Sequence, residues 1–255
     1  MISILASIVR FIVRSLSLIV YLLFLLAPIM MLVNHYRRLA TEEGSLKADR
    51  LAIGLANRLT RFFGVRVEVT GEPQTGPVLF AANHISWLDI TVLHSACAMG
   101  FVSKAEIESW PVFSSIARVG GTIFHQRGNH DSAADVSSAM EQRLQEGRAV
   151  AIFPEGGIKP GSPIRVFHAR MFRPAVEAGC PVQPVMVRYM RDGRIDADVA
   201  FRVGESMLIN VCRQLARPKA VAQVHFLPVI SALNQPRRVL ADGARASVVS
   251  CYEDL

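Results

Sequence analysis

An apolar run that leads directly into polar residues is the feature that most constrains the fold. Residues 77–82 read Pro-Val-Leu-Phe-Ala-Ala, the length of a buried β-strand, and residues 83–89 read Asn-His-Ile-Ser-Trp-Leu-Asp ahead of a helical pattern. The sequence therefore predicts His84 where a strand gives way to a helix, and Asp89 in the first turn of that helix. There the carboxylate can hold one ring nitrogen, and the other nitrogen faces outward as a base.

Two other strand ends carry polar residues in the same way. Residues 121–127 read Gly-Thr-Ile-Phe-His-Gln-Arg, and residues 153–156 read Phe-Pro-Glu-Gly. For His84 and Asp89 alone, a capping or core hydrogen bond is the alternative interpretation. The repeated pattern favours a site, because ligands of open α/β sheets bind outside the carboxyl ends of the strands.

Apolar runs alternate with helical patterns along most of the chain. Strands are predicted at residues 65–70, 77–82, 100–103, 122–125, 148–153, 182–188 and 220–227. Helices are predicted at 46–63, 89–96, 104–119 with a helix boundary at Pro111, 131–147, 172–178 and 205–215 and after Asn234. This order of elements indicates an α/β fold.

Composition limits the partners that the chain can take. With 255 residues and 51% hydrophobic residues the chain can bury one large core, and its net charge of +7 suits an acidic membrane surface or a phosphorylated substrate better than nucleic acid, for which no motif appears. The cysteines at 97, 180, 212 and 251 lack the spacing of a metal site. They indicate small core residues in a reducing compartment.

The amino-terminal segment is apolar enough to enter a membrane. Residues 15–33 carry no charge over 19 positions, which is roughly 28 Å of helix at about 1.5 Å per residue. Arg14 borders the segment on one side and Pro28 should kink it, so a helix lying obliquely in one leaflet is the alternative to a crossing. A cleaved signal peptide is disfavoured, because the apolar region is too long.

A second, basic helix is expected directly after this segment. In residues 46–63 leucines recur at helical spacing and Gly64 ends the pattern, while the opposite face and flanks carry Lys47, Arg50, Arg58 and Arg61. Such a helix either rests on anionic lipid or exposes an ordinary solvated face. We expect residues 1–63 to form a membrane anchor and residues 64–255 to form the catalytic domain.

The three strand ends form an ordered set with a fourth stretch, Pro-Val-Gln-Pro-Val at residues 181–185. Together they resemble the glycerolipid acyltransferase family that includes 1-acylglycerol-3-phosphate acyltransferases, whose blocks are N-H-x4-D, G-x-x-F-x-x-R, F-P-E-G and a Pro-Val-x-Pro block. The resemblance covers residues 63–188. It implies an α/β fold with a mixed central sheet flanked by helices, at the cell membrane, with the active site facing the cytoplasm.

The resemblance also implies roles for individual residues. His84 is expected to be the general base and Asp89 its orienting partner. Substrate binding is expected from Asn83, Lys104, Phe124, Arg127, Glu155, Gly156 and Pro184. The implied reaction moves an acyl group from acyl-CoA or acyl carrier protein, as co-substrate, to the free hydroxyl of 1-acylglycerol 3-phosphate, with no metal and no cofactor.

The chemistry of these side chains agrees with that reaction. A neutral His84 can take the proton of a lipid hydroxyl as it attacks a thioester carbonyl, and Asp89 can fix the ring tautomer. The guanidinium of Arg127 suits a phosphate, although a surface salt bridge is the alternative. Glu155 would accept a hydrogen bond from a substrate hydroxyl or hold Arg127, unless it is only a turn residue.

Departures from the family pattern leave the acceptor open. The family usually continues Thr-Arg-Ser after F-P-E-G, whereas this chain has Gly-Ile-Lys at residues 157–159, and it has Phe167-His168 where Phe-Lys is common. We expect Lys159, Arg165 and Arg170 to compensate. Another lysolipid, such as a lyso-ornithine lipid, is therefore a second possible acceptor.

Two other classes of function remain as alternatives. A lipid hydrolase would need a nucleophile, but the chain has no G-x-S-x-G, and neither Ser86 nor Ser103 belongs to a recognisable triad. A non-enzymatic membrane module would make His84, Asp89 and Arg127 coincidental.

Overall fold

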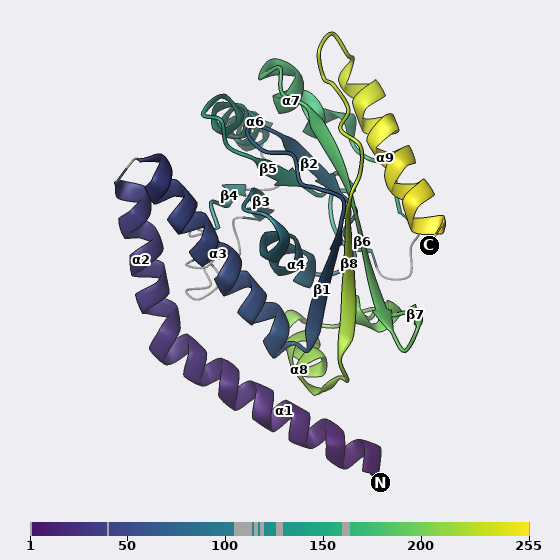
Figure 1. The fold of residues 1–255 in the computed structure, drawn as a ribbon. Helices are drawn as coiled ribbons and strands as arrows, with labels where there is room; N and C mark the ends of the chain where they lie inside the picture. Colours follow the sequence, from purple (N-terminus) through teal and green to yellow (C-terminus); the bar gives the residue numbers. More distant parts are fainter. Residues whose placement is uncertain are drawn as a thin grey trace.

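The protein is built around one mixed sheet. The computed structural model describes residues 2–39, 41–104, 114, 117, 120–125, 130–159 and 164–254. Within them the sheet has the strand order β1-β8-β6-β2-β5-β3-β4, and a short β7 pairs with β6 (Figure 1). The strands are β1 (Val65–Thr70), β2 (Leu79–Ala82), β3 (Gly100–Lys104), β4 (Ile123–His125), β5 (Val150–Ile152), β6 (Val182–Arg191), β7 (Arg194–Ile195) and β8 (Ala220–Phe226). The predicted α/β fold with a mixed central sheet is confirmed.

The direction of the strands gathers the motif residues at one edge of the sheet. β6, β2, β5, β3 and β4 all run parallel to one another, whereas β8 is antiparallel to β6 and carries β1 parallel to itself. The carboxyl ends of β2 and β5 therefore lie side by side, which brings His84 next to the turn that follows Ile152.

Helices cover both faces of the sheet, and alternate residues of the strands separate two cores. Phe80 and Ala82 of β2 join the core under α4 and α8, while Leu79 and Ala81 join the core under α6, α7 and α9. The helical segments are α1 (Ile2–Tyr21), η1 (Leu22–Leu26), α2 (Ala27–Arg38), α3 (Glu42–Phe62), α4 (Leu88–Ala96), α6 (His130–Gln145), η3 (Ala169–Phe172), α7 (Arg173–Glu177), η4 (Ala197–Val199), α8 (Met207–Ala216) and α9 (Arg237–Glu253). Most of the helix predicted at 104–119 lies outside the described residues.

The amino terminus is one long helical segment that bends once. α1 and α2 are joined by the π-helical turn η1, and Pro28 follows in the first turn of α2 (Figure 1). Proline has no backbone N–H and cannot donate the usual helical hydrogen bond. The π-turn before Pro28 takes up this change in hydrogen bonding, so the predicted interruption at Pro28 is a bend and the helix does not end there. By length and composition, Ile4–Arg38 is one helix of 35 residues that could cross a membrane.

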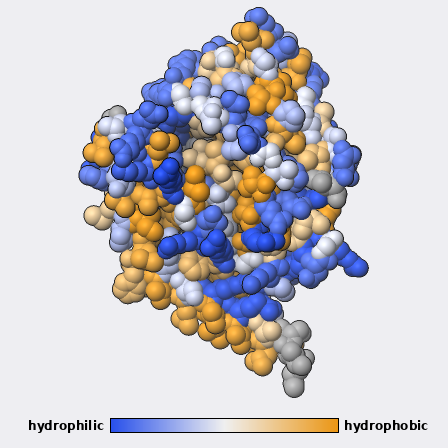
Figure 2. Space-filling model, in the orientation of Figure 1, coloured by the Kyte–Doolittle hydropathy of each residue, from blue (hydrophilic) through white to orange (hydrophobic). Residues whose placement is uncertain are grey.

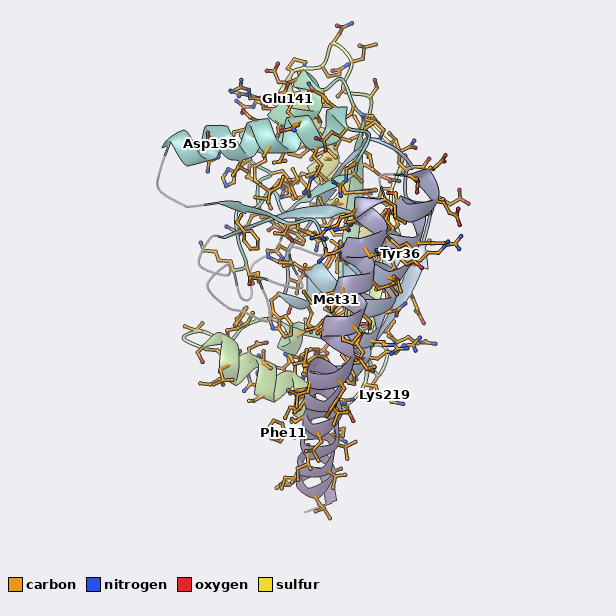
Figure 3. All side chains as sticks on the ribbon, turned by 90° about the vertical axis from the view of Figure 1, so that its left-hand side faces the viewer. Phe11, Met31, Tyr36, Asp135, Glu141 and Lys219 are labelled. Atoms are coloured by element: carbon orange, nitrogen blue, oxygen red, sulfur yellow. The ribbon has the colours of Figure 1, made fainter. Side chains whose placement is uncertain are left out.

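Much of this helix has no protein partner. Large apolar side chains such as Ile12, Leu16 and Leu23 are about half exposed or more. Figure 2 shows hydrophobic surface along the lower left of the molecule, where Figure 1 shows α1 and α2. Figure 3 places Phe11 on α1, beside α8, and Met31 on α2, far along the same helix.

α3 begins four residues earlier than predicted and ends next to Gly64, as expected. Thr41 caps it, because its hydroxyl accepts a hydrogen bond from the amide of Gly44 at 3.0 Å. Its small residues pack against α4, so α3 joins the amino-terminal segment to the sheet domain. The predicted boundary between residues 63 and 64 stays a prediction.

Candidate active site

The site begins where β2 leaves the sheet. The side-chain amide of Asn83 donates to the carbonyl of Val187 at 2.9 Å and accepts from the amide of Val187 at 2.8 Å. Asn83 is only 1% exposed, so both polar atoms are used inside the protein. These two hydrogen bonds continue the contact between β2 and β6 beyond the end of β2. They also fix the direction in which the backbone enters His84.

The carboxylate of Asp89 collects four hydrogen bonds at the start of α4. Its Oδ2 lies 2.9 Å from Nδ1 of His84 and also accepts from the amides of Ile85 at 2.7 Å and Ser86 at 2.9 Å. Its Oδ1 accepts from the hydroxyl of Tyr189 at 2.7 Å. Because Asp89 has no exposed surface, these donors replace the water that an ionised carboxylate needs.

These contacts determine which nitrogen of His84 can act as a base. The backbone amides of Ile85 and Ser86 can only donate, so Oδ2 is an acceptor, and Nδ1 of His84 is the donor in the hydrogen bond that it shares with Oδ2. In the neutral ring the lone pair then lies on Nε2. No residue in the described part of the chain hydrogen-bonds Nε2.

An aromatic side chain covers one face of the imidazole. The rings of His84 and Phe153 are stacked, with centroids 3.8 Å apart and planes 12° from parallel, and Phe101 lies behind Phe153 at 5.8 Å. Phe153 directly follows β5, and its neighbour Pro154 begins the turn of the F-P-E-G block. The stack limits rotation of the ring and excludes water from that face.

Glu155 connects the base to the opposite side of the site. Its Oε1 accepts from the backbone amide of His84 at 2.9 Å, and its Oε2 accepts from the backbone amide of Arg165 at 3.0 Å. The guanidinium of Arg165 lies 3.6 Å from Oε2 and donates to the carbonyl of Gly157. Glu155 is 5% exposed. In the structure both carboxylate oxygens therefore have protein partners, and the expected contact with a substrate hydroxyl or Arg127 stays a prediction.

Comparison with known proteins assigns the chain to a family. The family model described as Acyltransferase matches residues 66–188. The 1-acyl-sn-glycerol-3-phosphate acyltransferase of Neisseria meningitidis is 38% identical over 210 residues, 81% of this chain and 82% of that protein. The lyso-ornithine lipid O-acyltransferase of Pseudomonas aeruginosa is 36% identical over 202 residues, 76% of this chain and 78% of that protein. The chain belongs to the acyltransferase family. It is an enzyme, as the sequence predicts.

A solved structure confirms the fold of this acyltransferase. The crystal structure of the 1-acyl-sn-glycerophosphate acyltransferase PlsC from Thermotoga maritima matches with a TM-score of 0.72. The match covers 99% of this chain and 97% of that one, at 16% sequence identity. The likeness therefore extends to the amino-terminal helices, which sequence similarity alone describes least well.

Where the structure describes them, the remaining predicted site residues of the acyltransferase come from β3, β4, β6 and the turn after β5. Gly156 belongs to the turn after β5 and has a φ angle of 77°, which favours glycine. Pro184 is buried in β6 opposite Ala81 of β2, and Phe124 lies on β4, half-buried. Lys104 is the last residue of β3, and its side chain is outside the described residues, as is the whole of Arg127.

The departures from the family pattern gather around the F-P-E-G turn of the acyltransferase. A side chain at Gly156 would lie 3.3 Å from the ring of His168, so this exposed imidazole covers the turn. Lys159 and Arg170 are exposed, whereas Arg165 is held by Glu155 and Gly157. Of the three cations expected to compensate, Arg165 therefore has a role inside the protein.

Sequence reasoning missed two contributors to the site, Tyr189 and Phe153. Tyr189 lies 100 residues from Asp89 in the chain, so no local pattern could connect them. Phe153 was visible as the first letter of F-P-E-G, but its stacking on His84 depends on strand order. Among the described residues, no group of three or more His, Cys, Asp or Glu side chains could hold a metal ion.

Proposed function

We propose that this acyltransferase moves a fatty acyl group from a thioester to the free hydroxyl of a lysolipid, with 1-acylglycerol 3-phosphate as the acceptor and phosphatidic acid as the product. The observation that carries the proposal is the buried Asp89 carboxylate holding Nδ1 of His84 at 2.9 Å. Relatives named as acyltransferases for 1-acyl-sn-glycerol-3-phosphate support the acceptor.

In the proposed reaction Nε2 of His84 takes the proton of the acceptor hydroxyl while its oxygen attacks the thioester carbonyl. The tetrahedral intermediate then collapses, the carbon–sulfur bond breaks, and the imidazolium returns the proton to the departing thiolate. Acyl-CoA or acyl carrier protein supplies the thioester, and the step needs no metal, cofactor or covalent enzyme intermediate. Asp89 stabilises the imidazolium without being protonated itself.

Binding of the acceptor head is proposed for side chains around the same strand ends. Arg127 and Lys104 supply the charge for a phosphate, and Phe124 lines the approach from β4. Asn83 and Glu155 act by holding the backbone around His84, since Asn83 bonds to Val187 of β6 and Glu155 bonds to the amide of His84.

A lyso-ornithine lipid is the second candidate acceptor. Its support is the Pseudomonas aeruginosa relative, together with the loss of the usual Thr-Arg-Ser sequence after F-P-E-G. At residues 157–159 this chain offers two backbone positions without a polar side chain and one lysine, which weakens a site built for a simple phosphate.

We also propose that the amino-terminal helix anchors the enzyme in one leaflet. Arg10 donates to the carbonyl of Ala216 at 3.0 Å, and Arg14 donates to the carbonyls of Leu215 at 3.1 Å and Arg217 at 2.7 Å. These bonds satisfy the carboxyl end of α8 and hold α1 against the domain, which favours a helix lying along the membrane surface over one that crosses. Replacing Ile12, Leu16 and Leu23 with serine should weaken membrane binding, so that the enzyme no longer sediments with vesicles.

The test of the acceptor is mass spectrometry of products from the purified full-length enzyme. The enzyme receives equal amounts of 1-acylglycerol 3-phosphate, lyso-ornithine lipid and lysophosphatidylcholine, with palmitoyl-CoA or palmitoyl acyl carrier protein. The proposal expects phosphatidic acid as the dominant product with at least one donor. Dominant ornithine lipid would select the second candidate, and free fatty acid without any acylated product would indicate hydrolysis and contradict both.

A further inference from the structure

Tyr189 of β6 makes a contact that the reaction scheme above does not use. Its hydroxyl lies 2.7 Å from Oδ1 of Asp89, and the exposed fractions of the two side chains are 1% and 0%. We propose that Tyr189 is a positioning residue, which holds the Asp89 carboxylate in the one orientation that presents Oδ2 to His84. The inference rests on the proposed function, because it concerns how the proposed base is held.

The division of donors between the two oxygens is the first argument. The ring of His84 and the amides of Ile85 and Ser86 all bond to Oδ2. Oδ1 has Tyr189 as its sole partner among the described residues. Without this hydroxyl, a buried and charged oxygen would lack a hydrogen bond, which is costly. A carboxylate that rotates to give Oδ1 a new donor moves Oδ2 away from Nδ1.

The position of Tyr189 on β6 is the second argument. Val187 and Tyr189 are alternate residues of one strand, so they face the same side of the sheet. The backbone of Val187 holds Asn83, which precedes His84, and Tyr189 holds Asp89, which follows it. One strand therefore fixes both ends of the N-H-x4-D block, and a shift of β6 would disturb both contacts together.

The protonation state of Tyr189 agrees with this role. Burial, followed by the charge of Asp89 and the hydrogen bond to it, raises the pKa of Tyr189 well above its ordinary value of 10.0. The phenol therefore stays protonated and donates at any pH at which the enzyme works. It supplies direction to the carboxylate without adding a second negative charge beside His84.

The experiment is a double-mutant cycle in the full-length enzyme between Tyr189→Phe and Asp89→Asn, with palmitoyl-CoA and 1-acylglycerol 3-phosphate as substrates. Tyr189→Phe keeps the ring and removes only the hydroxyl. We expect kcat to fall about tenfold, as for the loss of one hydrogen bond to a charged group, with both KM values within twofold of the wild type. In the Asp89→Asn background the same change should alter kcat less than twofold, because the carboxylate it orients is gone.

Tyr252→Phe is the matched control, since Tyr252 lies on α9 and its ring is near Arg188 instead of the site. It should keep wild-type kinetics. A Tyr189→Phe enzyme with wild-type kcat, an equal loss in both backgrounds, or a loss confined to KM or to thermal stability would overturn the inference. An active His84→Ala enzyme would instead refute the proposed function, so the two failures are distinguishable.

Discussion

The polar ends of β2 and β5 lie side by side, yet they use their motif residues in opposite ways. At the end of β2 the protein binds Nδ1 of His84 and leaves Nε2 without a described partner. At the end of β5 the protein occupies both oxygens of Glu155 with backbone amides. We therefore expect Glu155 to serve the proposed reaction by holding the chain, and Nε2 of the neighbouring His84 to be the atom that meets the substrate.

Among substitutions at the two strand ends, we expect the largest loss of turnover at Asp89. In Asp89→Asn the amide can no longer accept from every donor around it, so the tautomer of His84 that places a lone pair on Nε2 loses its support. Steady-state kinetics should show kcat lower by roughly 10²–10⁴, with KM little changed. Asp242→Asn, at an exposed position of α9, is the control and should be silent. A fall of less than fivefold for Asp89→Asn would contradict the role of the carboxylate.

Glu155 tests the other strand end. In Glu155→Gln one oxygen can still accept, but the new amide group faces a backbone donor. We expect kcat to fall about tenfold and the free energy of unfolding to fall by about 1–3 kcal/mol, measured by kinetics and urea denaturation. Glu177→Gln removes only an exposed ion pair to Arg173 and should change stability by less than about 1 kcal/mol. If Glu155→Gln raised only the acceptor KM, Glu155 would be a substrate ligand after all.

A substitution at Gly157, in the turn after β5, should have a smaller effect on turnover. Its φ angle is 147°, a backbone conformation that residues other than glycine rarely adopt. Gly157→Ala should lower the free energy of unfolding by about 1–3 kcal/mol and reduce kcat less than tenfold. Gly54→Ala is the control: this helical glycine has open space around it, so alanine should stabilise by about 0.5–1 kcal/mol. Equal thermal stability of Gly157→Ala and the wild type would show that the turn is not strained.

The smallest expected effect on turnover lies outside both strand ends, at His94 of α4. Burial, with a smaller contribution from Arg37, lowers the pKa of His94 from 6.5 to about 4. In the unfolded chain the His94 ring is protonated near pH 6.5, whereas in the folded chain it is protonated only near pH 4. The free energy of unfolding therefore falls as the pH is lowered from about 6.5 to about 4, by up to about 3 kcal/mol. Between pH 7 and pH 4.5 the free energy of unfolding of His94→Leu should fall less than that of the wild type, as measured by denaturation. Its kcat at pH 7 should be near wild type. An unchanged acid sensitivity would assign it to other groups.

Local patterns predicted the elements around the site better than the contacts within it. The strand at Val65–Thr70 has its predicted bounds, because alternating polarity and the glycines at both ends are local signals. The β6–β7 hairpin was not predicted, although Asp192-Gly193 is a typical turn pair and both residues have positive φ. Its strand β7 has only two residues, too short for a periodic signal.

Contacts between distant residues explain what the sequence could not predict. The pairing of His84 with Asp89 spans five residues and follows from helix geometry, so spacing alone suggested it. The partners of Glu155 are 71 and 10 residues away, and they depend on the order of strands and on a loop. Likewise, Arg10 and Arg14 of the amino-terminal helix donate to carbonyl groups at the end of α8, which are 206 and 201 residues away in the chain.

Two histidines, His84 at the end of β2 and His168 beside the turn after β5, give the most direct test of the central claim that Nε2 of His84 is the base. His84→Ala and His168→Ala are compared by kcat with saturating donor and acceptor, alongside thermal unfolding of each protein. We predict that His84→Ala lowers kcat by roughly 10²–10⁴ without loss of stability, and that His168→Ala, which removes an exposed ring over Gly156, lowers it less than tenfold. A His84→Ala enzyme within tenfold of the wild type, or a larger loss in His168→Ala, would contradict the account.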